Sequence, residues 1–304
     1  MLAVTILGNN SALPAFDRHP TAQVITLDEH LFLMDCGEGT QMQMAKYRIR
    51  RSRINHIFIS HLHGDHYFGL IGLITSMGLL GREHDIHLYA PAPLRALIDM
   101  QLKVADTALP YLLHFHPLEP GVLVEEEKFR VRCFPVSHRI PCWGFRFDQV
   151  RAPRRVVPSK ALEAGVPVAY FDDLKKGRDF TAADGRLIPN GAVTQPAPAP
   201  LSYGYSADTL YNEKLADDVR GVSLLYHETT YLRDLADRAT KRFHCTTDQA
   251  ATIAVKAGAG RLIIGHFSSK YEQLHEFEKE AREIFPPTDL AVEGVTYVAV
   301  PGGS

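Results

Sequence analysis

The segment from His61 to His66 gathers four metal-ligand side chains in six positions. Its order, His-Leu-His-Gly-Asp-His, supplies three imidazoles and one carboxylate, which we expect on a tight loop. These groups would repel one another when protonated, unless a cation holds them together. Imidazole combined with carboxylate favours zinc over calcium, magnesium or a thiolate cluster. The segment therefore predicts a catalytic metal centre.

Three more ligand types stand where predicted strands end, namely His138, Asp208 and His266. Side chains at strand ends are held by a rigid frame and face an open edge. Each has a structural alternative when it is taken alone, since an Asp can begin a turn and a His can cap a loop. Together with the first segment, they supply the seven ligands, one of them a bridging carboxylate, that a two-metal site needs. The strands that run toward them are expected at Val131–Val136, Leu201–Ala207 and Leu262–Gly265.

The elements around the metal-ligand segment are predicted from the spacing of apolar residues. The alternating run Ile54–Ser60 is rich in β-branched residues and predicts a buried strand directly before His61. Tyr67–Leu80 has the length of a helix, with small residues that allow close packing. We expect an opening antiparallel meander of three strands at Leu2–Leu7, Gln23–Leu27 and Leu31–Asp35. Later strands are expected at His87–Ala90, Val222–Tyr226 and Gly294–Val300, and helices at Thr246–Ala257 and Glu272–Phe285.

The composition is that of an ordinary globular protein. The 304 residues are 45% hydrophobic and 22% charged, with a formal net charge of −2. That charge argues against non-specific coating of nucleic acid but permits local basic surfaces, at Lys46–Arg53, Arg151–Lys160 and Lys175–Arg178. No apolar run is long enough to span a membrane, and residues 1–8, which we expect to form a first strand, lack the basic start and the cleavage site of a signal peptide. The four cysteines form no C-x-x-C pair, and without an export signal we expect reduced thiols and a cytoplasmic protein.

Residues 151–200 differ from the rest of the chain. They hold seven prolines and two of the basic clusters, with little sustained apolar periodicity. We expect them to form an insertion within a single domain that spans residues 1–304, not a separate domain.

Several motifs resemble those of one enzyme family. The H-x-H-x-D-H segment resembles that of metallo-β-lactamase-fold hydrolases, and the other motifs resemble ribonuclease Z, the family of tRNA 3′-processing endonucleases. The resemblance runs in order from Leu7 nearly to the C-terminus. The residues that carry it are Asp35 to Gln41, Ser206 to Thr209, His227 to Thr230, His244 to Thr247 and Gly265 to Tyr271.

The resemblance implies an α/β (α+β) fold, a four-layer αββα sandwich with a flexible inserted arm at residues 151–200 that grips tRNA. It also implies two zinc ions per subunit and a homodimer that acts on precursor tRNA. His61, His63 and His138 would hold one zinc ion, and Asp65, His66 and His266 the other, with Asp208 between them. Asp35 would orient a ligand without binding metal itself.

The same resemblance assigns further roles. Asp65 would act as a general base as well as a ligand, and His244 would donate a proton to the leaving oxygen. Glu228 would fix the tautomer of His244, and His227 would belong to the same group of loop residues. The structural alternative for His227, Glu228 and His244 is a buried polar network that supports the site.

Two segments depart from the family pattern. The family's P-x-K-x-R-N loop has Phe16 in place of its Lys and His19 in place of its Asn. A Gly-Pro pair in the arm is replaced near Val168–Ala169. The handling of precursors that carry CCA and the affinity of the arm for tRNA are therefore open.

Two other classes of function remain possible from the sequence. A small-molecule phosphodiesterase, or a thioester or lactam hydrolase, would keep the His61–His66 segment but would not need a basic arm. A non-catalytic RNA-binding module would not need a bridging Asp208.

Overall fold

The computed structural model describes residues 1–150 and 152–300, so Arg151, the first residue of the expected insertion, lies outside the described residues. The chain divides into two compact units. The large unit comprises Met1–Glu125, Phe129–Asp148 and Leu201–Ser304, and the small unit comprises Glu126–Lys128 and Gln149–Pro200. Among the described residues, no helix combines the length and the apolar character that crossing a membrane requires.

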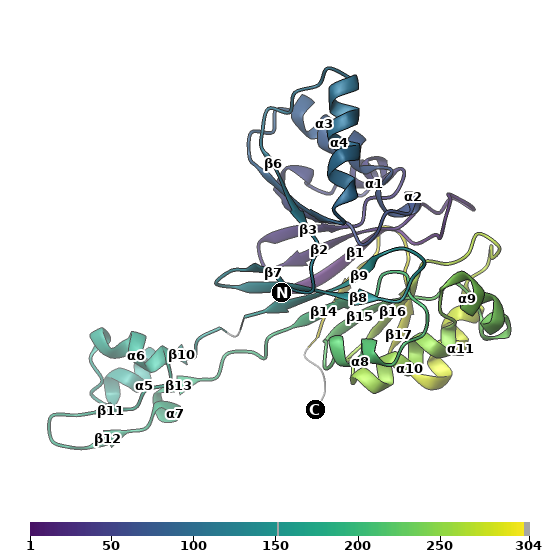
Figure 1. The fold of residues 1–304 in the computed structure, drawn as a ribbon. Coiled ribbons are helices and arrows are strands. Elements are labelled where there is room, and N and C mark those ends of the chain that lie inside the picture. Colours follow the sequence, from purple (N-terminus) through teal and green to yellow (C-terminus); the bar gives the residue numbers. More distant parts are fainter. Residues whose placement is uncertain (151, 301–304) are drawn as a thin grey trace. The chain divides into compact units, whose positions relative to one another are not determined.

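Two seven-stranded sheets form the centre of the large unit (Figure 1). The first sheet has the order β18-β1-β2-β3-β4-β5-β6, and its strands are β1 (Leu2–Gly8), β2 (Ala22–Leu27), β3 (His30–Met34), β4 (Ile54–Phe58), β5 (Ile86–Ala90), β6 (Leu113–Pro117) and β18 (Thr296–Val298). The second sheet has the order β17-β16-β15-β14-β9-β8-β7, and its strands are β7 (Gly121–Glu125), β8 (Phe129–Val136), β9 (Cys142–Gln149), β14 (Ser202–Tyr205), β15 (Leu224–Glu228), β16 (Leu262–Gly265) and β17 (Thr288–Leu290). Aromatic side chains from both sheets, including Phe32, Phe58, Phe145 and Phe147, form the core between them.

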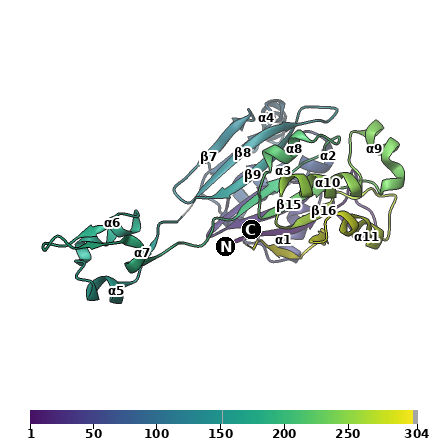
Figure 2. The same cartoon turned by 90° about the horizontal axis from the view of Figure 1, so that it is seen from below.

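Helices cover the outer faces of both sheets (Figures 1 and 2). On the first sheet lie α1 (Thr40–Lys46), α3 (Leu70–Leu79) and α4 (Pro93–Val104), which bury a second apolar cluster that includes Leu73, Ile74 and Ile98. On the second lie α8 (Lys214–Asp218), α10 (Thr247–Ala257) and α11 (His275–Ile284), over a third cluster. The short helix α2 (Gly64–Tyr67) precedes α3, and α9 (Ala236–Arg242) precedes α10. The layers are therefore helix, sheet, sheet and helix, which confirms the predicted αββα sandwich.

Parallel pairing brings the strand ends of each sheet to a common edge. In the first sheet, β3 to β6 run parallel after the antiparallel meander of β1, β2 and β3. In the second, β14 to β17 run parallel. Loops that leave the carboxyl ends of parallel strands emerge side by side, so groups far apart in sequence can converge there.

Two of the predicted elements whose bounds differ from expectation flank the metal-ligand segment. The strand predicted at Ile54–Ser60 ends at Phe58, and the Ser60 backbone N–H instead donates to the Asp35 carboxylate, at 2.7 Å. The helix predicted over Tyr67–Leu80 is confirmed for Leu70–Leu79, but its start is wrong, since Phe68 and Gly69 separate α3 from α2. The Gly69 N–H donates to the Cys36 carbonyl at 2.9 Å, and a Cβ at position 69 would lie 2.2 Å from the Gly37 carbonyl oxygen. Close contact with another loop, invisible in local periodicity, breaks the helix.

The small unit has a core of its own, formed by Ala161, Val166, Leu174, Ile188 and Val193. Its elements are β10 (Arg155–Val156), α5 (Pro158–Glu163), the 3₁₀ helix Val168–Tyr170, α6 (Phe171–Lys175), β11 (Phe180–Thr181), β12 (Leu187–Ile188), α7 (Asn190–Val193) and β13 (Thr194–Gln195). The buried side-chain amide of Asn190 donates to the carbonyls of Leu174 and Arg178, at 2.7 and 3.0 Å. These bonds join the end of α6 to the start of α7.

Candidate metal centre

The His61–His66 segment leaves β4 and crosses the carboxyl edge of the first sheet. His61 is fully buried, whereas His63 is partly exposed. The expected loop is wrong for the second half of the segment, because α2 begins at Gly64 and carries both Asp65 and His66. The single helical turn directs these two side chains toward Asp208 and His266, which follow strands of the second sheet.

Two groups of ligand types that share no residue meet at this edge, and a third group, Asp208, His244 and His266, overlaps both. His61, His63, His138 and Asp208 form the first, with their ligand atoms all within 4.8 Å of one another. The second group, at the same separation, consists of Asp65, His66 and His266. The structure thus brings together all seven side chains that the sequence singled out.

The first group is tightly packed. His63 Nδ1 lies 3.0 Å from His61 Nε2 and 3.1 Å from His138 Nε2. The Nδ1 of His138 lies 3.0 Å from the carbonyl oxygen of Phe243, which fixes this ring with Nε2 directed at the group. Loop residues from both sheets therefore form one cluster of imidazole nitrogens.

Asp208 lies between the two groups. One carboxylate oxygen, Oδ2, is 3.7 Å from His61 Nε2 and 3.4 Å from His66 Nε2, and the other, Oδ1, is 3.3 Å from His266 Nε2. Asp65 Oδ2 lies 3.6 Å from His66 Nε2 and 3.4 Å from His266 Nε2. A carboxylate placed in this way can bridge two cations.

The electrostatics of the cluster fit bound cations. Burial opposes ionisation of Asp208, yet the neighbouring imidazoles of His266 and His66 hold its pKa well below its usual range. Burial likewise lowers the pKa of His63 to about 4, with the repulsion of His138 in addition. Ionised carboxylates and neutral imidazoles are the forms that bind metal.

His66 shows where positive charge is required. Burial disfavours its protonated form, but Asp208, Asp65 and Asp35 together raise the pKa of His66 well above the ordinary value. Its Nε2 is buried and has no hydrogen-bond partner among the described residues. A divalent cation at Nε2 would satisfy both this atom and the surrounding carboxylates, so the donor set fits zinc.

Asp35 contacts the cluster through the Nδ1 side of the His66 ring. Its buried carboxylate lies 2.8 Å from His66 Nδ1 and accepts the Ser60 hydroxyl at 2.9 Å. Tyr205, on β14, donates its hydroxyl to the same oxygen, Oδ2, at 2.7 Å. No sequence pattern indicated Tyr205, because its contact with Asp35 arises only when the two sheets pack together.

His244 also pairs with Glu228, beside the cluster. Glu228 ends β15, and its Oε1 lies 3.0 Å from His244 Nδ1. Two backbone N–H groups, those of Cys245 and Thr230, hold the carboxylate at 2.9 and 3.0 Å. Burial opposes protonation of His244, but Glu228, with Asp208 and Asp65, raises its pKa to about 9. This raised pKa favours the imidazolium form of His244, in which Nε2, the nitrogen that does not face Glu228, would carry a proton.

His227 lies apart from these groups. Its ring is fully buried, and its Nδ1 is 2.6 Å from the Glu228 carbonyl oxygen. It is not among the described residues that line the metal-site pocket. Its catalytic role stays a prediction.

A pocket of about 320 Å³ opens over the cluster. Besides predicted residues, it is lined by four that the sequence did not indicate: Ser11, Ala12, Phe68 and Arg139. The Ala12 N–H donates to Asp65 Oδ2 at 2.7 Å, and Arg139 Nη2 lies 3.3 Å from His63 Nε2. The pocket thus adds a guanidinium and an aromatic ring to the metal-ligand types.

The two departures from the family pattern have clear surroundings. Phe16 is half exposed and, like Asp17, has positive φ, at the tip of a turn closed by Ala15 and Arg18. His19 Nδ1 lies 3.0 Å from Glu293 Oε2, so this imidazole is paired within the large unit. Val168–Ala169 begin the 3₁₀ helix of the small unit.

Comparison with known proteins extends the similarity along the whole chain. The chain is 41% identical to ribonuclease Z of Parabacteroides distasonis, over 96% of this chain and 97% of that protein. It is 42% identical to ribonuclease Z of Bacteroides thetaiotaomicron, over 95% and 93% of the two chains. A family model described as anti-Pycsar protein Apyc1 matches residues 2–151.

Solved structures show the same fold. The crystal structure of human tRNase Z, short form (ELAC1), superposes with a TM-score of 0.71 at 25% identity, covering 98% of this chain and 99% of that chain. The metallo-beta-lactamase fold protein YhfI from Bacillus subtilis superposes with a TM-score of 0.69 at 18% identity, covering 98% and 100%.

Proposed function

The chain belongs to the ribonuclease Z family, and we propose that it is a zinc-dependent endoribonuclease that removes the 3′ trailer from precursor tRNA. The products are a tRNA with a 3′-hydroxyl and a trailer with a 5′-phosphate. The observation that carries this proposal is the convergence of seven ligand types on one edge, with the His244–Glu228 pair beside them.

We assign two zinc ions per subunit to this cluster. His61, His63 and His138 would hold one, Asp65, His66 and His266 would hold the other, and Asp208 would lie between them. When bound, the zinc ions supply Lewis acidity, which lowers the pKa of water and offsets charge on the phosphoryl oxygens.

The protein's own residues supply the proton transfers. Asp65, with its Oδ2 fixed by the Ala12 N–H, accepts a proton from the attacking water. His244 donates the proton on Nε2 to the departing 3′-oxygen, while Glu228 holds Nδ1 and stabilises the imidazolium. His227 supports this pair through the backbone of Glu228.

The small unit is the proposed tRNA-binding arm. Between Gln149 and Pro200 the sequence has eight basic and five acidic side chains. Several basic groups are paired locally, such as Lys175 with Asp172 at 2.8 Å and Arg178 with Asp173 at 3.0 Å. The remaining excess of positive charge suits backbone phosphates, whose contacts weaken with salt.

A homodimer in the cytoplasm, where precursor tRNA is processed, completes the proposal. Exposed apolar side chains on and beside α3 and α4 support a second copy as the partner of this face: Leu79, Leu80, Met100, Val104 and Leu112.

The double variant Leu79→Glu/Val104→Glu should be monomeric by light scattering, whereas Val255→Glu on α10 should not. A wild-type protein that is monomeric at micromolar concentration would contradict this part.

The test of function compares two substrates. The zinc-loaded protein should cut a 3′-extended precursor tRNA at one position, after the discriminator base, with much higher kcat/KM than it shows for bis(p-nitrophenyl) phosphate. Hydrolysis of the small substrate with no cleavage of the precursor would instead indicate a small-molecule phosphodiesterase.

A further inference from the structure

Phe68 is an exposed aromatic side chain at the rim of the metal-site pocket. It is 64% exposed and follows α2, the helix that carries Asp65 and His66. It lines the pocket together with His63 and Asp65. Among the described residues that line this pocket, no other is a phenylalanine, tyrosine or tryptophan.

The position of the Phe68 ring is fixed by its own helix. A Cβ at Gly64 would lie 2.1 Å from Cε2 of Phe68, so the ring covers the bare Cα of Gly64. The Phe68 N–H donates to the Gly64 carbonyl at 2.9 Å, and the Tyr67 ring packs against Phe68 with a centroid distance of 5.0 Å. These contacts place the ring beside the helix that carries Asp65 and His66.

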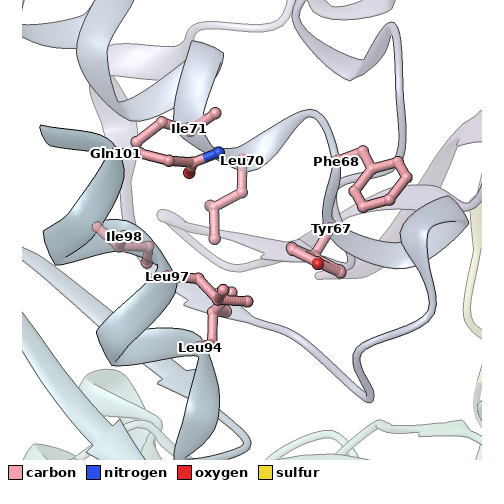
Figure 3. Close-up of a pocket in the computed structure, with 8 residues that line it drawn as sticks. All are labelled: Tyr67, Phe68, Leu70, Ile71, Leu94, Leu97, Ile98 and Gln101. Atoms are coloured by element: carbon pink, nitrogen blue, oxygen red, sulfur yellow. The ribbon is translucent and has the colours of Figure 1, made fainter. Parts of the chain in front are cut away.

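The same ring borders a second, apolar pocket (Figure 3). This pocket, of about 100 Å³, lies between α3 and α4 and is lined mainly by Leu70, Ile71, Leu94, Leu97 and Ile98. In Figure 3 the Phe68 ring stands at one side, and Leu94, Leu97 and Ile98 follow α4 on the other. Phe68 thus joins the chemical centre to an apolar recess.

We propose that Phe68 stacks on an unpaired nucleobase next to the scissile phosphate. The inference rests on the proposed function, which places single-stranded RNA at this pocket. Aromatic side chains bind unpaired bases by stacking, and each stacked base contributes about 1–3 kcal/mol by alanine substitution. The base belongs either to the last tRNA nucleotide or to the first trailer nucleotide, since both flank the same phosphate.

Abasic substrates test this contact. In single-turnover assays, Phe68→Ala should lower kcat/KM for an intact precursor about 5- to 150-fold, and Phe68→Trp should retain most of the activity. An abasic site at the position that Phe68 contacts should slow the wild type by a similar factor and leave Phe68→Ala no slower. On the substrate with the other abasic site, Phe68→Ala should remain slower than the wild type by the full factor. The pair of substrates therefore identifies the nucleotide that Phe68 contacts.

Controls separate this inference from the proposed function. Val255→Ala, at a half-exposed apolar position on α10, should match the wild type, and zinc content of Phe68→Ala should be unchanged. The inference is overturned if Phe68→Ala cleaves the intact precursor as fast as the wild type. It is also overturned if Phe68→Ala is slower than the wild type by the same factor on both abasic substrates. Failure of the wild type to cut any precursor would overturn the proposed function itself.

Discussion

At the scale of single residues, the site depends on carboxylates that are buried but ionised. Asp208 and Glu228 are nearly inaccessible to water, yet nearby imidazoles and hydrogen bonds hold the pKa of each below its usual range despite the cost of burial. Such groups are stable only when positive charge compensates them. Around Asp208 the proposed compensation is the metal pair, and around Glu228 it is the His244 imidazolium.

The role of His244 can be tested by changing the leaving atom. His244→Ala should slow cleavage of the natural precursor about 100- to 10,000-fold, because the departing oxygen then lacks its proton donor. With sulfur in place of the scissile 3′-oxygen, the leaving thiolate needs no proton, so the variant should approach the wild-type rate. Asp208→Ala should be slow on both substrates. An equal loss for His244→Ala on both would exclude the acid role.

Tyr205 should act on metal affinity through Asp35. Tyr205→Phe removes one hydrogen bond to the carboxylate that contacts His66, and comparable changes behind metal ligands weaken binding about 10-fold or more. Competition with a chelator measures this effect without catalysis. Tyr203→Phe is the matched control, because that buried hydroxyl donates its hydrogen bond to Gln23. Equal zinc affinities of the two variants would contradict the role of Tyr205.

At the scale of elements, a row of histidines crosses the first sheet away from the metal-site edge. His56 on β4 pairs with His87 on β5, which pairs with His114 on β6. Their rings stack with centroid distances of 5.1 and 4.8 Å. Burial, with the added repulsion of His87, His30 and His116, lowers the pKa of His56 to about 4.

This row should make the fold sensitive to acid. Below the pKa of about 6.5 that His56 has in the unfolded chain, the unfolded state is protonated at His56 while the folded state is not. The free energy of unfolding therefore falls as the pH falls toward 4. Between pH 7 and 5 the wild type should lose about 2 kcal/mol more than His56→Phe, in urea titrations of zinc-free protein. His275→Asn, at an exposed position, should behave as the wild type. Parallel pH dependences for wild type and His56→Phe would contradict this origin.

The strands and helices also show which parts of the fold can be predicted from the sequence. The local sequence located the strands before His61, His138, Asp208 and His266, each of which is short and buries at least half of its residues. It could not locate the break between α2 and α3, which arises from contact of Gly69 with Gly37. A periodic pattern shows which side of a helix or strand is buried. It does not show which distant loop that element contacts.

The same limit applies to the site. The ligand types were visible in the sequence because their chemistry is specific and their order resembles a known family. Phe68 and Arg139 were not, since an exposed Phe or a single Arg occurs in any protein and only the fold places them over His63. Residues that act through position are the ones that a sequence hides.

At the scale of the whole molecule, binding and chemistry are assigned to different units. Deleting residues 151–200 should weaken binding of precursor tRNA about 10-fold or more while sparing bis(p-nitrophenyl) phosphate, because only the polymer needs phosphate contacts away from the cut. The milder variant Lys160→Glu/Lys176→Glu should weaken binding and reduce the salt dependence, by about one unit of slope for each phosphate that is no longer bound. Lys279→Glu on α11 is the charge control. Equal loss on both substrates would mean that the small unit is structural.

The most direct test of the account is the chemistry of the product ends. Zinc-loaded wild-type protein should cut a 3′-extended precursor tRNA once, leaving a tRNA 3′-hydroxyl and a trailer 5′-phosphate, and Asp208→Ala should leave the precursor intact while still binding it. These ends are required if water, activated between the two metal-ligand groups, attacks the phosphorus. A 2′,3′-cyclic phosphate on the tRNA, or undiminished cleavage by Asp208→Ala, would contradict the account.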